Sequence, residues 1–253
     1  MALSTPAPAR ALTRANMARL LRRIVARLNT PAIIRRVRAD RLTYLEPAAL
    51  VWLYEAVQQI ETESVPGAII EAGCALGGST IVIASAKRPE RPMKAYDTFA
   101  MIPPPSERDG ADVHERYAEI VSGRSAGIGG DQYYGYHGDL LGKVRDSFVH
   151  YGLNPEKNHI EFIKGLFQDT LHPSGPIALA HIDGDWYDSV TTCLERIVPR
   201  LAPGGRLIID DYFAYSGCRD AIGDYFRARM DDDFRFVYGP RLLIRRADRL
   251  TAK

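Results

Sequence analysis

Short apolar runs alternate with amphipathic helical segments through most of this chain of 253 residues. Five runs are short and mainly apolar, which is typical of buried parallel strands; they cover 68–72, 93–96, 159–163, 177–182 and 207–209. Helical patterns precede, separate and follow these runs, at 46–61, 79–86, 140–151, 190–201 and 218–229. This alternation predicts an α/β fold in which helices cover both faces of a mostly parallel sheet.

The end of the chain departs from this pattern. Two further strand-like segments, 234–238 and 242–244, are separated by little more than Gly239-Pro240. A connection this short cannot hold a crossover helix, so the two segments should form an antiparallel hairpin. We therefore expect seven strands, with the hairpin at the C-terminal end.

Carboxylates follow two of the predicted strands. The run 177–182 leads into Asp183-Gly-Asp185, and the run 207–209 leads into Asp210-Asp211. Ligands of open α/β sheets bind beyond the carboxyl ends of the strands, and carboxylates gathered there repel one another unless a cation lies between them. A divalent cation held by oxygen ligands satisfies this requirement, although a single such aspartate could equally cap a helix or a turn.

The first three strands carry features of a cofactor site. Strand 68–72 leads through Glu71 into a glycine-rich loop whose spacing is neither G-x-G-x-x-G nor a P-loop. An acidic strand end disfavours a pyrophosphate and suits a ligand with an amino or sulfonium group. Asp97 ends the second strand, where it could accept both ribose hydroxyls, and Gln168-Asp169 follows the third strand, where it could meet an adenine amino group. Together these features indicate S-adenosylmethionine rather than a phosphate-rich cofactor.

Several of these motifs resemble the macrocin O-methyltransferase family over about residues 41 to 246. The motifs are Glu71-Ala-Gly-Cys-Ala-Leu-Gly-Gly-Ser, Tyr96-Asp-Thr-Phe, Lys164-Gly-Leu-Phe-Gln-Asp-Thr-Leu, Ile182-Asp-Gly-Asp-Trp-Tyr-Asp-Ser and Gly204-Gly-Arg-Leu-Ile-Ile-Asp-Asp-Tyr. The resemblance implies a Rossmann-like class I methyltransferase fold and a metal- and S-adenosylmethionine-dependent enzyme that methylates sugar or phenol hydroxyls of bacterial natural products.

The resemblance also implies roles for individual residues. Mg²⁺ would be bound by Asp183, Asp210 and Asp211, and Asp183 would also lie near the attacking hydroxyl and take its proton. The cofactor would be held by Glu71, Gly73, Ser79, Asp97, Thr98, Gln168 and Asp169. We expect His181 to be structural.

The segment 99–138 is long and irregular, with three consecutive prolines and a run rich in glycine and tyrosine. A long insertion in a compact domain is usually a lid, a binding loop or a disordered segment, and its clustered aromatic residues favour a lid over the acceptor. His114 and His137 lie in this insertion and could act on the acceptor.

Charge divides the chain into two parts. Residues 1–41 contain ten arginines and one acid, Asp40, for a charge of +9; the whole chain carries +2, so residues 42–253 carry −7. We interpret 1–41 as a basic helical extension, including a helix at 11–28, and 42–253 as the methyltransferase domain. The extension is expected to be solvated and used in homo-oligomer contacts rather than to bind nucleic acid.

No apolar segment is long enough to span a membrane, no secretory signal is visible, and the three cysteines lack metal-ligand spacing, so we expect a cytoplasmic protein with reduced thiols. The acceptor is expected to be a glycoside or sugar. The alternatives are an O-methyltransferase for a phenol or catechol, a metal-independent enzyme with another base, an NAD-type oxidoreductase, and a non-catalytic protein anchored by its basic N-terminus.

Overall fold

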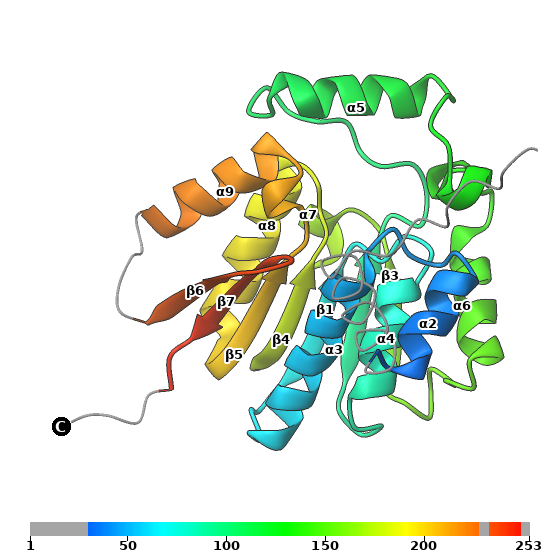
Figure 1. The fold of residues 1–253 in the computed structure, drawn as a ribbon. Coiled ribbons are helices and arrows are strands. Elements are labelled where there is room, and N and C mark those ends of the chain that lie inside the picture. Colours follow the sequence, from blue (N-terminus) through cyan, green and yellow to red (C-terminus); the bar gives the residue numbers. More distant parts are fainter. Residues whose placement is uncertain (1–29, 228–232, 249–253) are drawn as a thin grey trace, which may run out of the picture.

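A computed structural model describes residues 30–227 and 233–248. Its centre is a seven-stranded sheet in the order β3-β2-β1-β4-β5-β7-β6, with helices on both sides (Figure 1). The strands are β1 (Ala68–Ala72), β2 (Met93–Asp97), β3 (Ile160–Lys164), β4 (Ile177–Ile182), β5 (Leu201–Ile209), β6 (Phe234–Tyr238) and β7 (Leu242–Arg246). The predicted fold class is confirmed, including the number of strands.

Eight α-helices accompany the sheet in the described ranges. They are α2 (Ala32–Ala39), α3 (Pro47–Thr62), α4 (Gly78–Ala86), α5 (Ala111–Val121), α6 (Leu140–His150), α7 (Phe167–Thr170), α8 (Tyr187–Ile197) and α9 (Ser216–Arg227). Short 3₁₀ turns occur at η1 (Ile128–Gly130), η2 (Tyr134–Tyr136), η3 (Val198–Arg200) and η4 (Asp211–Phe213). The predicted helix 11–28 lies outside the described residues.

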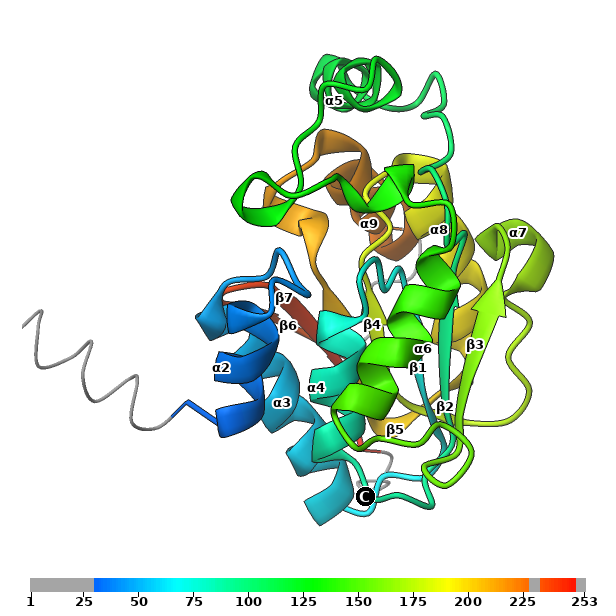
Figure 2. The ribbon, with the colours of Figure 1, turned by 90° about the vertical axis from the view of Figure 1, so that its right-hand side faces the viewer.

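Successive strand residues face opposite sides of the sheet, and this divides the interior into two cores. Ile69 and Leu179 face a core built with α2, α3, α4 and α6, whereas Ile70 and Ala180 face a core built with α8 and α9. The two helical layers are visible on either side of the sheet in Figure 2. Because both faces of the central strands are covered, β4 is buried along its whole length, as its apolar sequence requires.

The first five strands pair in parallel and the last two close the sheet in the antiparallel direction. β7 pairs with both β5 and β6, and Leu242 at its start lies opposite Ile209 at the end of β5. The loop 239–241 that joins β6 to β7 therefore reaches the carboxyl end of the parallel strands. This placement brings Arg241 beside the carboxylates that follow β5.

Most elements lie within one or two residues of their predicted bounds, and two differ by more. The predicted helix 190–201 ends at Ile197, because Pro199 follows within a 3₁₀ turn, and β5 begins at Leu201 although it contains Pro203 and two glycines. Helix α2 lies within the segment expected to be a basic extension. Its Ile34 and Val37 are fully buried in the core, so this part of the segment packs against the domain, where α2 contacts α4 and α3.

The insertion 99–138 carries α5, which lies apart from the sheet above the carboxyl ends of the strands (Figure 1). Polar contacts attach the insertion to the start of α8 and α9. The Trp186 indole Nε1 donates to the Pro103 carbonyl at 2.9 Å, the Tyr187 backbone N–H donates to Asp109 at 2.8 Å, and the Ser216 N–H donates to Asp112 at 2.9 Å. Among the described helices, none has the length and apolar character needed to cross a membrane.

Candidate active site

A cavity of about 490 Å³ opens at the carboxyl ends of β1, β2, β4 and β5. Its wall combines the glycine-rich loop after β1, the acidic segments after β4 and β5, and the insertion. This is the position at which α/β sheets bind their ligands. The cavity therefore joins the two regions that the sequence predicted as the cofactor site and the metal site.

The loop after β1 is shaped by Gly73 and tied down by Asp97. Gly73 adopts φ +90°, and a Cβ placed there would lie 1.9 Å from the backbone oxygen of Asp183. One carboxylate oxygen of Asp97 accepts from the N–H groups of Cys74 and Ala75 at 2.8 and 2.9 Å, and the other accepts from the N–H of Phe99 at 2.7 Å. Burial raises the pKa of Asp97, and these backbone donors oppose the rise. Asp97 thus builds the loop as well as facing the cavity.

The seven predicted cofactor residues divide into two groups. Gly73, Asp97, Thr98 and Gln168 line the cavity. The structure places the others outside the lining: the carboxylate of Glu71 is fully buried against the His181 imidazole at 3.0 Å, Ser79 is buried in α4, and Asp169 is exposed in α7. Cofactor contact through these three side chains stays a prediction.

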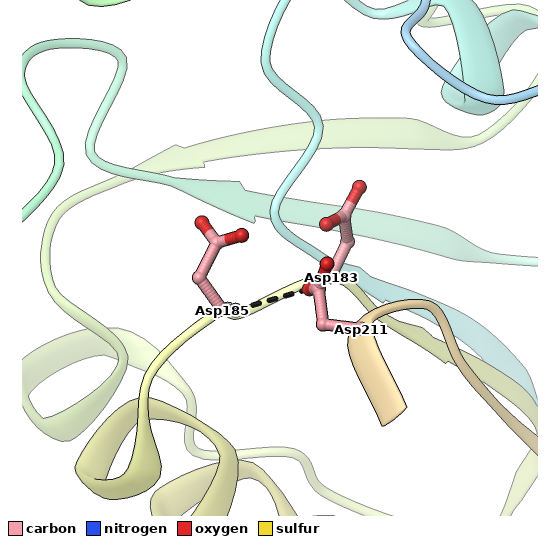
Figure 3. A group of neighbouring side chains, drawn as sticks. All are labelled: Asp183, Asp185 and Asp211. Carbon is pink, nitrogen blue, oxygen red and sulfur yellow. Dashed lines mark hydrogen bonds between the residues drawn. The ribbon is translucent and has the colours of Figure 1, made fainter. Parts of the chain in front are cut away.

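Three carboxylates converge beside the loop. Asp183 and Asp185 after β4 and Asp211 after β5 each offer an oxygen within 4.8 Å of the others (Figure 3). The backbone N–H of Asp185 donates to the Asp211 carboxylate at 3.1 Å, which fixes the two segments together. Such a group is a chemically suitable ligand set for a hard divalent cation.

The electrostatics of this group also fit a cation. Burial, followed by repulsion from neighbouring carboxylates, raises the pKa of Asp183 and of Asp185 well above the usual value. Burial and the charge of Asp210 raise the pKa of Asp211 to about 6. Burial and mutual repulsion disfavour the charged forms of these carboxylates, and a cation among them would stabilise those forms.

Asp210, the remaining predicted metal ligand, is held by basic side chains. Its Oδ1 accepts from Arg241 Nε at 2.5 Å and lies 3.8 Å from His181 Nε2, and Arg241 also pairs with Glu46 at 3.2 Å. Burial alone would raise the pKa of Asp210, but His181 and Arg241 outweigh it and lower this pKa. Asp210 therefore lies at the cavity wall, next to the group of three carboxylates rather than within it.

His181 connects the two sides of this network. It is completely buried, and its Nδ1 contacts Glu71 at 3.0 Å on β1 while its Nε2 faces Asp210 after β5. Burial by itself lowers the pKa of His181, but Asp210 and Glu71 outweigh it and raise the pKa to about 9. The protonated imidazole of His181 thus lies between the carboxylates of Glu71 and Asp210, where its positive charge offsets their negative charge.

The insertion supplies an aromatic and basic wall opposite the carboxylates. The rings of Tyr133 and Tyr134 pack against each other with centroids 4.4 Å apart and planes inclined at 42°, and the Arg116 guanidinium lies 5.6 Å from the centroid of Tyr133; all three line the cavity. His114 and His137 lie outside the lining, and His137 contacts Lys143 Nζ at 3.3 Å. A direct role of either histidine on the acceptor has no support from this arrangement.

Sequence reasoning missed three features of the site. Asp185 belongs to the converging carboxylates, and its spacing from Asp183 was the available signal. Arg241 and the buried Glu71–His181 pair depend on strand order, because they join segments 31 and 110 residues apart. Backbone strain marks the same region, since Ala75, Phe99 and Asp185 have φ values of 44, 45 and 51°.

Comparison with known proteins shows to which family the chain belongs. The family model described as "Macrocin-O-methyltransferase (TylF)" matches residues 42–234. The chain belongs to this macrocin-O-methyltransferase family. The resemblance seen in the sequence motifs is confirmed.

Characterised relatives of this macrocin-O-methyltransferase family member modify natural products. A tetracenomycin-C rhamnosyl 4'-O-methyltransferase of Streptomyces olivaceus is 36% identical over 182 residues, covering 68% of the chain and 63% of the relative. A mycinamicin III 3''-O-methyltransferase of Micromonospora griseorubida is 30% identical over 183 residues, covering 68% and 65% respectively. The match therefore spans slightly under two thirds of the length of these relatives.

Solved structures show the same fold. The O-methyltransferase NovP aligns with a TM-score of 0.63 and 26% identity over 79% of each chain. The calicheamicin methyltransferase CalS11 aligns with a TM-score of 0.58 over 96% of this chain and 99% of its own, but its identity of 17% supports a common fold alone. The macrocin-O-methyltransferase family member thus has a class I methyltransferase fold.

Proposed function

We propose that this chain transfers a methyl group from S-adenosylmethionine to a sugar hydroxyl of a bacterial glycosylated natural product and that the transfer requires Mg²⁺. The observation that carries the proposal is that the glycine-rich loop and the carboxylates of Asp183, Asp185 and Asp211 line one and the same cavity. Family membership and the sugar methyltransferases among the relatives agree with it.

The cavity wall suits S-adenosylmethionine. Gly73 and Ala75 present backbone to the cavity, and Asp97, Thr98 and Gln168 offer it hydrogen-bonding groups. No phosphate-binding glycine fingerprint occurs in the sequence. The acidic character of the nearby wall favours a ligand with a sulfonium and an amino group. Bound there, the cofactor supplies an electrophilic methyl group.

Asp183 and Asp211, together with Asp185 or Asp210, are proposed to hold Mg²⁺, which supplies positive charge that stabilises an acceptor alkoxide. Methyl transfer also needs a base, because the acceptor hydroxyl must lose its proton. Asp183 is the proposed base. Asp185 is the second candidate, because it lines the same cavity and offers a carboxylate oxygen within 4.8 Å of those of Asp183 and Asp211.

Three experiments test this proposal. Calorimetry should detect binding of S-adenosylmethionine to the protein and no binding of NAD. Labelled methyl transfer to a panel of rhamnosides, a macrolide glycoside and a catechol should label the glycosides, and labelling of the catechol alone would replace the sugar by a phenol acceptor.

Mn²⁺ binding followed by electron paramagnetic resonance should separate the aspartates. Asp210→Asn should weaken metal binding and recover activity at high Mg²⁺. Asp183→Asn should lose activity without rescue. If Asp185→Asn abolishes activity while Mn²⁺ binding is unchanged, the base is Asp185 rather than Asp183.

A further inference from the structure

An aromatic surface leads out of the cavity over η4 and the end of β6. Phe213 lines the cavity and is nevertheless 53% exposed, and Tyr238 is 62% exposed. Tyr212 completes a cluster of three rings, with ring centroids 5.1 Å from Phe213 and 6.0 Å from Tyr238, and the rings of Phe213 and Tyr238 are 6.5 Å apart. We call Tyr212, Phe213 and Tyr238 the aromatic platform.

The platform is continuous with the wall of the cavity. Ala214 and Tyr215 follow Phe213 and line the cavity, and Tyr215 contacts Trp186 with ring centroids 5.3 Å apart. An apolar path therefore runs from beside Asp211 to solvent. Exposed aromatic groups gathered at a cavity mouth indicate a binding surface, because isolated surface positions do not need three large rings in contact.

The charge of the cavity restricts the acceptor. Its lining contains six acids, Glu46, Asp97, Asp183, Asp185, Asp210 and Asp211, and two bases, Arg116 and Arg241. Arg241 is paired with Asp210 and Glu46, and Arg116 is paired with Glu119 at 2.6 Å. Even with a divalent cation bound among these acids, the lining keeps a formal charge of −2. Both of its arginines are already paired, so the two phosphates of a nucleotide-linked sugar would meet an acidic wall and compete for those arginines.

From these two features we propose that the aromatic platform is the subsite for an uncharged, apolar aglycone of the acceptor, whose sugar enters the cavity. This inference rests on the proposed function and deepens it. A glycosyl transfer from a nucleotide-linked sugar to the aglycone must then precede methylation, since the substrate reaches this site as a finished glycoside.

The test uses matched glycosides that differ only in the aglycone: the octyl and methyl glycosides of rhamnose and of glucose, below the micelle concentration. Binding is measured by saturation-transfer NMR with Mg²⁺ and S-adenosylhomocysteine present. Each buried methylene contributes up to about 0.8 kcal/mol to binding. Partial burial of the octyl chain should therefore make the octyl glycoside bind about 10-fold or more tightly than the methyl glycoside, for both sugars.

Variants locate this preference. Phe213→Ser and Tyr238→Ser should each lower the octyl-to-methyl ratio at least about threefold, and together they should bring it close to one. Val149→Ser, which removes a 68% exposed apolar side chain on α6, is the matched control and should keep the wild-type ratio. Thymidine-diphosphate rhamnose should bind more weakly than methyl rhamnoside.

Three results would overturn the platform: equal binding of octyl and methyl glycosides, an unchanged ratio in the double variant, or tight binding of the nucleotide sugar. Sedimentation of wild type and the double variant covers another occupant, since a shift from dimer to monomer would assign the platform to an interface between copies. Calorimetry with S-adenosylmethionine on the same preparation keeps the two proposals separate, because intact cofactor binding with a failed platform leaves the proposed function standing.

Discussion

Replacing His181 by Gln should remove a pH-dependent part of the stability of this protein. His181 is completely buried between Glu71 and Asp210, and its pKa is raised from 6.5 to about 9. At about 1.4 kcal/mol per unit of pKa, this rise means that protonation of His181 stabilises the folded state by about 3 kcal/mol relative to the unfolded state. His181→Gln keeps much of the volume but cannot carry the charge.

The sign of the effect follows from the raised pKa. The folded state binds the proton more tightly than the unfolded state, so the stabilisation is fully present below pH 6.5 and is lost as the pH rises through about 9. Wild type should therefore lose about 3 kcal/mol between pH 6.5 and 9.5 relative to His181→Gln, so the stability difference between the two proteins should shrink by that amount over this range.

Urea unfolding at several pH values, with EDTA present to exclude metal effects, measures this difference. His150→Gln is the matched control, because it makes the same substitution at an exposed position on α6. A constant difference between wild type and His181→Gln across this pH range would refute the buried imidazolium.

Three further expectations concern the loop and the insertion. Gly73→Ala should destabilise the protein by at least about 2 kcal/mol more than Gly123→Ala in urea unfolding, because both positions have positive φ but only the first would drive a Cβ into backbone. Equal losses would show that the close approach to Asp183 is easily relieved. Asp97→Asn should weaken S-adenosylmethionine binding by about 1.5–3 kcal/mol in calorimetry, since the loop loses a charged acceptor; unchanged affinity would remove Asp97 from the site. Segment 99–138 should gain hydrogen-exchange protection when cofactor and acceptor bind, and equal protection in both states would argue against a lid.

The sequence was sufficient for most of the sheet because the signals there are local. β1 and β4 match their predicted bounds, since each is a short apolar run whose two faces meet different cores. α2 was harder to foresee. Its two buried residues, Ile34 and Val37, lie among arginines, and only packing against the domain distinguishes the helix from a solvated basic segment.

The candidate site shows the same division. Asp183 and Asp211 could be brought together from the rule that strand ends share one edge of the sheet. The partners of Asp210 could not, because the placement of Arg241 requires β7 to insert between β5 and β6. Pairings that depend on non-consecutive strand order leave no periodic trace in the sequence.

Metal dependence is the most direct test of the central claim that the converging carboxylates support methyl transfer. The measurement is the initial rate of labelled methyl transfer to a glycoside acceptor, before and after exhaustive EDTA treatment and after adding Mg²⁺ back. We expect the metal-free protein to retain S-adenosylmethionine binding but to lose transfer, and excess Mg²⁺ to restore it. Transfer at the full rate by a verified metal-free preparation would contradict the claim and would leave Asp183, Asp185 and Asp211 with structural or general-base roles only.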